Sequence, residues 1–75
     1  MLEKVREILV ESLHIKGEDV IPTARLNEDL GIDSLSSIEL ALEIESAFNI
    51  KIEDEELMTL KTVQDVIDII NSKLN

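Results

Sequence analysis

The residue with the clearest chemical potential in this 75-residue sequence is Ser34, which stands between Asp33 and Leu35. A serine acts as a nucleophile when a nearby base takes its proton. The single histidine, His14, lies on another predicted element, and no Gly-x-Ser-x-Gly turn surrounds Ser34. The chain also has no cysteine, which excludes disulfides, thiolate metal sites and a thiol nucleophile. We therefore expect that the protein is not an enzyme.

Clusters of acidic residues could be taken for metal ligands, but their spacing does not fit such a site. Asp29 and Asp33, and the acidic run at residues 53–56, lack the ligand positions of an EF-hand loop. Gly17 and Gly31 belong to no loop that could cradle a phosphate. We expect no dedicated metal site.

Acidic residues are concentrated in the middle of the chain. The net charge is -10, and residues 27–57 contain ten acidic residues and one basic residue, Lys51. This balance excludes a nucleic-acid binder, which needs a basic surface to displace counterions. Two interpretations of the acidic segment remain open. It is either a solvated face or a docking surface that speeds encounter with basic partners.

Length and hydropathy limit the class of protein further. A chain of 75 residues makes one domain, residues 1–75. No apolar run approaches the roughly 20 residues of a membrane span, and no signal-peptide pattern opens the chain. We expect a monomeric, cytoplasmic domain that does not insert into membranes. Its core must be aliphatic, because Phe48 is the only aromatic residue.

The first element expected is an amphipathic helix over about residues 2–15. Its apolar residues follow the 3.6-residue period of a helix, and they are Leu2, Val5, Ile8, Leu9 and Leu13. We expect Gly17 to stop this helix, and Pro22 prevents easy continuation. Residues 16–33 then form a long loop. Four apolar residues should pin the loop to the core: Ile21, Leu26, Leu30 and Ile32.

Three further helical segments follow the loop. The second helix should begin with Asp33 as its N-cap and end near Phe48, with Asn49 as the stop residue. A short helical turn is expected at about residues 54–58. Thr62 and Asp65 resemble a capping box before a last helix at about 63–74. The sequence thus predicts an all-α fold, a small bundle of three main helices plus a short third helix, with a long loop between the first and second helices.

The second helix carries two apolar stripes on nearly opposite sides. The broad stripe is the natural core face, and its residues are Leu40, Ala41, Ile44, Ala47 and Phe48. The other stripe consists of Leu35, Ile38 and Leu42, with Ser34 at its N-terminal edge and Glu39 and Glu45 beside it. Three stacked apolar residues form a patch if they are exposed. The alternative is that the loop or the short helix buries this second stripe as well.

Around Ser34 the sequence resembles the acyl carrier proteins. Their signature is a Gly-x-Asp-Ser-Leu stretch that enters an acidic second helix, and it is matched here by residues 31–35, followed by Ile38, Glu39 and Leu40. The likeness continues through the acidic residues up to Leu57 and reaches Thr62-Val63-Gln64 and residues 67–70. It covers roughly residues 26–70, more than half of the chain.

The resemblance implies that Ser34 is an attachment point rather than a catalytic nucleophile. In this family the matching serine is joined by a phosphodiester to 4'-phosphopantetheine, which a magnesium-dependent transferase takes from coenzyme A. The arm ends in a thiol that carries acyl groups as thioesters, and a chain without cysteine needs an imported thiol. A phosphodiester in the first helical turn also gains from the helix dipole and the free N–H groups. Ser34, Asp33 and Leu35 would form the cofactor site.

The resemblance implies partners as well. They would be a phosphopantetheinyl transferase and enzymes with basic docking surfaces that transfer, extend or modify the acyl chain. By analogy, Asp33 would orient the serine and contact the transferase. Apolar residues would meet the partner enzymes or shelter the acyl chain, and acidic residues would pair with basic side chains. These partner-binding residues would be Leu35, Ile38 and Leu42, with Glu39 and Glu45.

Some residues depart from the pattern of the family. Ser36 stands where an acid is frequent, Ser46 and Ala47 interrupt the usual acidic run, and Glu53 replaces a common proline. The pathway is therefore left open between general fatty-acid synthesis and a specialised route such as polyketide synthesis or lipid modification. Two alternatives to an acyl carrier remain: a carrier for aminoacyl or peptidyl groups, and an acidic interaction or calcium-binding module with an unmodified Ser34.

Overall fold

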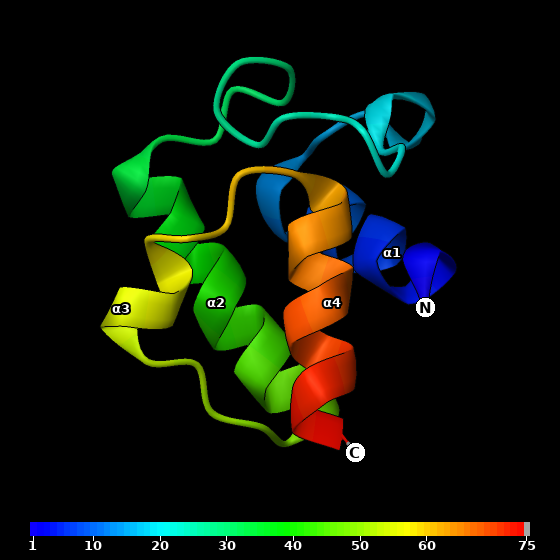
Figure 1. Ribbon diagram of the computed structural model, residues 1–75. Helices are drawn as coiled ribbons and strands as arrows, with labels where there is room; N and C mark the ends of the chain where they lie inside the picture. The colour runs from blue at the N-terminus through cyan, green and yellow to red at the C-terminus, as the bar shows by residue number, and fades with distance from the viewer. Residues whose placement is uncertain (75) are drawn as a thin grey trace.

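Four α-helices and one short 3-10 helix make up the structure. The computed structural model describes residues 1–74, and Asn75, the last residue of the predicted domain, lies outside them. The elements in chain order are α1 (Leu2–Leu13), the 3-10 helix η1 (Gly17–Asp19), α2 (Ser34–Phe48), α3 (Asp54–Leu57) and α4 (Val63–Leu74) (Figure 1). No strand occurs among the described residues, where one isolated bridge pairs Arg25 with Thr62. The predicted all-α bundle with a short third helix is confirmed.

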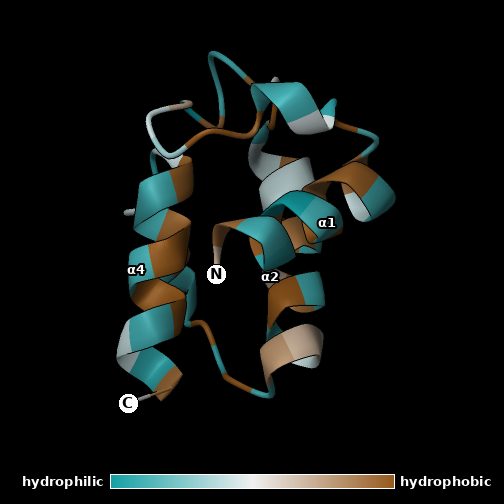
Figure 2. Ribbon diagram, turned by 90° about the vertical axis from the view of Figure 1, so that its right-hand side faces the viewer, coloured by the Kyte–Doolittle hydropathy of each residue, from teal (hydrophilic) through white to brown (hydrophobic). Residues whose placement is uncertain are grey.

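The long connection between α1 and α2 crosses one end of the bundle. Both α2 and α4 begin at this end, and the C-terminus lies at the opposite end (Figure 1). Helix α1 packs against α2, and the short α3 also lies beside α2. The hydrophobic side of α4 faces the inside of the bundle, while its other side is polar (Figure 2). Ser34 is therefore placed at the end of the molecule that the long loop covers.

Helix α1 ends earlier than the sequence predicts. We expected a helix to about residue 15 with Gly17 as the stop, but α1 ends at Leu13 and His14 adopts the left-handed conformation, with φ 57°. The His14 N–H donates to Val10 O at 3.1 Å and the Ile15 N–H donates to Leu9 O at 3.3 Å. These bonds satisfy carbonyls that a helix end leaves free. Histidine is among the residues that tolerate this backbone conformation.

Arg6 fastens the start of the long loop to α1. Its Nε donates to Gly17 O and its guanidinium also donates to Val20 O, each at 3.0 Å. Glu3 pairs with the same guanidinium from the preceding turn. The position of η1 thus depends on one side chain of α1. This role of Arg6 is not visible in the sequence, because hydrogen bonds from a side chain to distant carbonyls leave no periodic pattern.

The rest of the loop is held by backbone hydrogen bonds to the segment before α4. Leu26 N–H donates to Lys61 O at 2.9 Å, and Val63 N–H donates to Ala24 O at 3.0 Å. Among the apolar residues expected to pin the loop, Leu26 and Ile32 are buried and Leu30 is half-buried, whereas Ile21 is exposed. The expectation for Ile21 was wrong. The chain instead buries its neighbour Val20, whose carbonyl Arg6 binds.

The core is aliphatic throughout the described part of the chain. Helix α2 contributes Leu40, Ala41 and Ile44 to it, as the broad stripe predicts. Phe48 is half-buried, and Ala47 is exposed because the last turn of α2 is covered only on the Phe48 side. The placement of Ala47 in the core was therefore wrong. No polar or charged residue within residues 1–74 is buried.

Replacing one residue from each stripe of α2 tests these assignments. Ile44→Ala should lower the free energy of unfolding by about 2–5 kcal/mol, because it leaves a cavity in the core. Leu42→Ala should change it by less than about 1 kcal/mol, because Leu42 is 60% exposed. Urea unfolding monitored by circular dichroism measures both values. Ile44→Val, expected to cost about 1 kcal/mol, keeps the comparison possible if Ile44→Ala does not fold. Equal losses at the two positions would contradict the assignment.

Candidate functional site

Ser34 is the first residue of α2 and is exposed. Asp33 caps the helix, as the sequence predicts: its Oδ1 accepts the Ser36 N–H at 2.8 Å and its carbonyl accepts the Ser37 N–H at 2.9 Å. At the other end, Asn49 stops the helix in the left-handed conformation, with φ 55°. The local sequence therefore fixes where α2 begins, and this places the serine in its first turn.

The turn before Asp33 brings the chain out of the core just before the serine. Gly31 has φ +68°, a conformation that L side chains rarely adopt. The next residue, Ile32, is buried, and its N–H donates to Leu26 O at 2.8 Å. Asp29 steadies the turn by accepting the Arg25 N–H at 2.8 Å. As a result, Ile32 is buried, whereas the next two residues, Asp33 and Ser34, are exposed.

The hydroxyl group of Ser34 has no hydrogen-bond partner within residues 1–74. Ser37, one turn later, donates its own hydroxyl to the Ser34 carbonyl at 2.8 Å. The main-chain oxygen of Ser34 is thus engaged while its side chain is free. An unengaged, exposed hydroxyl can accept a covalent group without breaking a bond inside the fold.

The Asp33 carboxylate is stabilised in its charged form. The Ser36 backbone N–H lowers the pKa of Asp33 below its ordinary value, and the Ser36 side chain acts in the same direction. The Arg25 backbone N–H likewise lowers the pKa of Asp29. Both carboxylates therefore stay ionised at neutral pH. Asp33, directly before Ser34, adds negative charge at the start of α2.

An open cavity of about 550 Å³ lies beside Ser34. Seven of its lining residues are polar or charged: Arg25, Asn27, Glu28, Asp33, Ser34, Ser37 and Lys61. The other lining residues are apolar and come from the long loop, α2 and the segment around α3: Leu26, Ile32, Leu40, Ala41, Ile44, Leu57, Met58 and Leu60. The cavity thus combines a polar rim beside Ser34 with apolar side chains, which are the groups that a small apolar ligand contacts.

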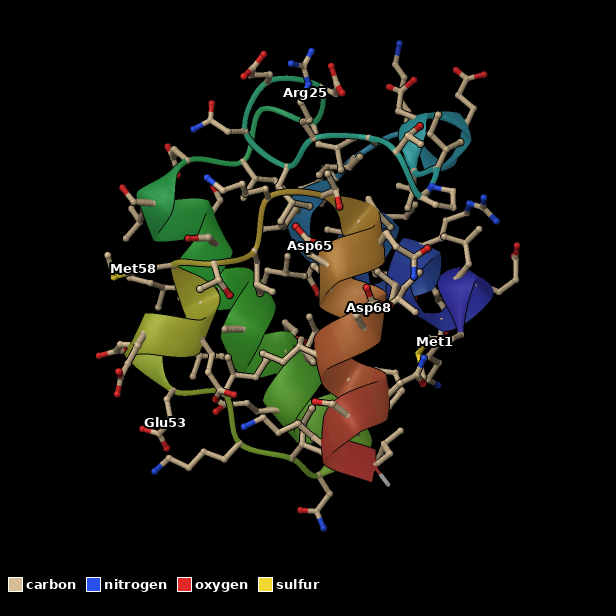
Figure 3. The ribbon with its side chains drawn as sticks, viewed as in Figure 1. Met1, Arg25, Glu53, Met58, Asp65 and Asp68 are labelled. Carbon is tan, nitrogen blue, oxygen red and sulfur yellow. The ribbon has the colours of Figure 1, made fainter. Side chains whose placement is uncertain are left out.

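The second stripe of α2 is exposed, which excludes the alternative that it is buried. Leu35 is 70% exposed, Ile38 50% and Leu42 60%. Met58, just after α3, is 83% exposed and projects away from the body of the molecule (Figure 3). Ser34, Ile38 and Met58 line a second hollow between α2 and α3. We call Leu35, Ile38, Leu42 and Met58 the outer apolar strip. Met58 was missed, because the short helix α3 has too few residues to show a period.

The two acidic residues predicted beside this strip have different settings. Glu39 is exposed and has no hydrogen bond or ion pair among the described residues. Glu45 is half-buried, and its Oε2 accepts the Ile52 N–H at 2.7 Å. Glu45 therefore helps to hold the segment that leads to α3. Sequence periodicity placed it on the helix surface but could not show this bond.

No arrangement for binding a metal ion and no membrane span is found in the described part of the chain. Residues 1–74 contain no group of three or more His, Asp or Glu side chains positioned to hold a metal. None of the helices described is long and apolar enough to cross a membrane.

Fold and site define a small helical domain that presents an exposed serine at a helix start, next to a partly apolar cavity. A family model described as a phosphopantetheine attachment site matches residues 3–70. The chain is 49% identical to an acyl carrier protein of Thermosynechococcus vestitus over 74 residues, covering 99% of this chain and 91% of that protein. It is 40% identical to an acyl carrier protein of Petrotoga mobilis over 75 residues, covering 100% of this chain and 88% of that one.

A solved structure is also similar. The crystal structure of an acyl carrier protein from Thermotoga maritima superposes with a TM-score of 0.87 at 36% sequence identity, covering 97% of this chain and 85% of that chain. The chain belongs to the acyl carrier protein family, whose cofactor is 4'-phosphopantetheine. It is a carrier and not an enzyme. The alternatives of an aminoacyl carrier and of an unmodified acidic module are not supported.

The cap that Asp33 makes should give this site a measurable pH dependence. Because the folded state lowers the pKa of Asp33, the ionised carboxylate adds stability above its unfolded-state pKa, near 3.8. That stability is lost as the pH falls through the folded-state pKa. The difference in free energy of unfolding between the wild type and Asp33→Asn should therefore shrink when the pH is lowered from about 6 to about 2.5. Urea unfolding at a series of pH values measures it.

Asp19→Asn is the matched control, because Asp19 is exposed and its carboxylate makes no hydrogen bond within residues 1–74. This comparison also corrects for the general charge repulsion, which acidification relieves in every variant. A difference between wild type and Asp33→Asn that stays constant with pH, or that Asp19→Asn reproduces, would contradict the role of the Asp33 cap.

Proposed function

We propose that Ser34 carries the 4'-phosphopantetheine arm and that the protein presents acyl groups on this arm to biosynthetic enzymes. The observation that carries the proposal is the position of the free Ser34 hydroxyl, at the start of α2 and beside a partly apolar cavity. The motif of residues 31–35 also supports Ser34 as the attachment residue. Ser36 and Ser37 are the nearest other serines, and Ser37 already donates its hydroxyl to Ser34 O.

The residues around Ser34 fit the attachment of a phosphodiester. In the transfer, the Ser34 oxygen forms a bond to the phosphorus next to pantetheine in coenzyme A. The adenosine bisphosphate part leaves, and a base on the transferase takes the hydroxyl proton. A charged phosphodiester on Ser34 then lies at the N-terminus of a 15-residue helix, where the helix dipole favours negative charge. Asp33 supports this geometry by fixing the first turn of the helix.

The cavity supports a role in holding the acyl chain. When bound, the arm supplies a thiol that carries the acyl group as a thioester. The apolar lining from Leu40, Ile44 and Leu57 offers that chain a place out of water. Burial of apolar surface there contributes about 25 cal/mol per Å². The protein would thus shield its cargo between encounters with enzymes.

The outer apolar strip supports docking of partner enzymes. Glu39 follows Ile38 on α2, and Asp54 lines the same hollow as Ile38 and Met58; both acidic residues are exposed. A partner with an apolar patch bordered by Arg and Lys would be complementary in both respects. We propose the phosphopantetheinyl transferase and acyl-transferring, chain-extending or chain-modifying enzymes as such partners. The cytoplasmic location and the monomeric state stay predictions from the sequence.

Mass spectrometry tests the attachment residue directly. Incubation with coenzyme A, magnesium and a broad-specificity transferase should add the mass of one phosphopantetheine group to the wild type and none to Ser34→Ala. Ser36→Ala and Ser37→Ala are the matched controls, because they remove the two neighbouring hydroxyls, and both should accept the group. Transfer to Ser34→Ala, or no transfer to a folded wild type, would refute the proposal.

A charge reversal tests the docking face. Glu39→Lys should lower kcat/KM for modification by a transferase about three- to tenfold at low salt, because it weakens attraction to basic residues. The difference from wild type should become small at about 0.5 M salt, where exposed charges are screened within a few Å. Glu11→Lys, an exposed position on α1, makes the same charge change away from the strip. Equal effects of the two substitutions, or an effect of Glu39→Lys that does not depend on salt, would contradict docking at this face.

A further inference from the structure

Helix α3 is held to the core through one partly buried side chain, that of Leu57. None of its four residues is buried, whereas the opposing wall contains the buried Leu26, Leu40 and Ile44. Leu57, at the end of α3, lines the cavity, and so do Met58 and Leu60. A four-residue helix is too short to be stable by its own hydrogen bonds. The position of this wall therefore depends on contacts that α3 makes with the rest of the chain.

One ion pair joins α3 to α4. Lys73 Nζ lies 2.7 Å from Glu56 Oε1, and the same oxygen accepts the Glu53 N–H at 2.9 Å in the capping box of α3. The other ion pairs within residues 1–74 join residues at most four positions apart, whereas this one spans 17 positions. Its side chains are 26% and 35% exposed, so solvent screens the pair less than a fully exposed one. The Lys73 hydrogen bond also lowers the pKa of Glu56.

We propose that the Lys73–Glu56 ion pair is a latch that holds α3 against the bundle and controls how readily the cavity beside Ser34 opens. Release of Glu56 removes the contact to α4 and weakens the capping box at the same oxygen. Leu57 and Met58 follow directly, so movement of α3 displaces the wall that they form. The expected effect on a bound acyl group rests on the proposed function, whereas the stabilisation of α3 by the ion pair does not.

Amide hydrogen exchange in the unmodified protein tests the hold on α3. The Leu57 and Met58 N–H groups donate to Glu53 O and Asp54 O, at 3.0 Å and 3.1 Å, and they report on the helix. In Lys73→Gln their exchange should be about two- to fivefold faster, as expected for loss of a partly exposed ion pair. Amides of α2 should keep their rates. Lys73→Arg should restore slow exchange, because it keeps the charge.

Lys51→Gln is the matched control. It removes a lysine near the same helix, but the Lys51 side chain is 80% exposed and its Nζ lies 3.9 Å from Glu53 Oε1. The latch would be overturned if the Leu57 and Met58 amides exchanged at the same rate in Lys73→Gln as in Lys51→Gln. A uniform acceleration across all four helices, or failure of Lys73→Gln to fold, would also overturn it, because the pair would then be a general stabiliser.

Cleavage of a loaded thioester tests the control of the cavity. With an eight-carbon acyl group on the arm, hydroxylamine should cleave the thioester about two- to fivefold faster in Lys73→Gln than in the wild type, and Lys51→Gln should match the wild type. Equal rates in all three proteins would overturn the link between the latch and the cavity. If the wild-type protein did not accept the phosphopantetheine arm, only the proposed function would be overturned. The role of the ion pair in holding α3 would still be tested, because amide exchange is measured on the unmodified protein.

Discussion

The buried side chains of residues 1–74 are all Leu, Ile, Val or Ala. The chain has one aromatic residue and no cysteine, so neither large aromatic contacts nor disulfides support the bundle. At this size, burial and chain entropy nearly cancel and the net stability is only a few kcal/mol. Each other feature depends on this aliphatic core: α2 can present a free serine and an exposed apolar strip because its opposite side is firmly buried.

The acidic charge works against this small core. Residues 27–57 contain ten acidic residues and one basic residue, and like charges destabilise a compact state. Some of these carboxylates are used inside the fold: Asp33 caps α2, Glu45 binds the Ile52 N–H and Glu56 binds Lys73. Others, including Glu39 and Glu55, remain exposed. The fold thus tolerates repulsion among carboxylates of which its own hydrogen bonds and ion pairs offset only some.

The sequence predicted those features that repeat or that act locally. The apolar period located the helices, Asp33 and Asn49 marked the ends of α2, and the reciprocal bonds of Thr62 and Asp65 confirm the expected capping box. It failed where contacts join distant segments. The hold of Arg6 on η1 and the exposure of Ile21 depend on tertiary packing. The end of α1 was placed too late for a different reason: Gly17 was expected to stop the helix, whereas His14 adopts the left-handed conformation that ends it. At the candidate site, the position of Ser34 in the first turn of α2 and the second apolar stripe of this helix could be predicted. The cavity, the exposure of Met58 and the hydrogen bond of Glu45 required the three-dimensional arrangement.

The hydrogen bonds between residues 24–26 and 61–63 have a consequence for the order in which the protein folds. They join segments that are far apart in sequence. Closing so long a loop has an entropic cost that does not arise when a helix forms from neighbouring residues. The turn that leads to Ser34 is fixed to this junction through Leu26 and Ile32. We therefore expect the serine to reach its final setting late in folding, after the segment before α4 has left the ribosome. A chain that ends before residues 61–63 would lack these hydrogen bonds, and the turn that leads to Ser34 would lose its attachment to the rest of the bundle.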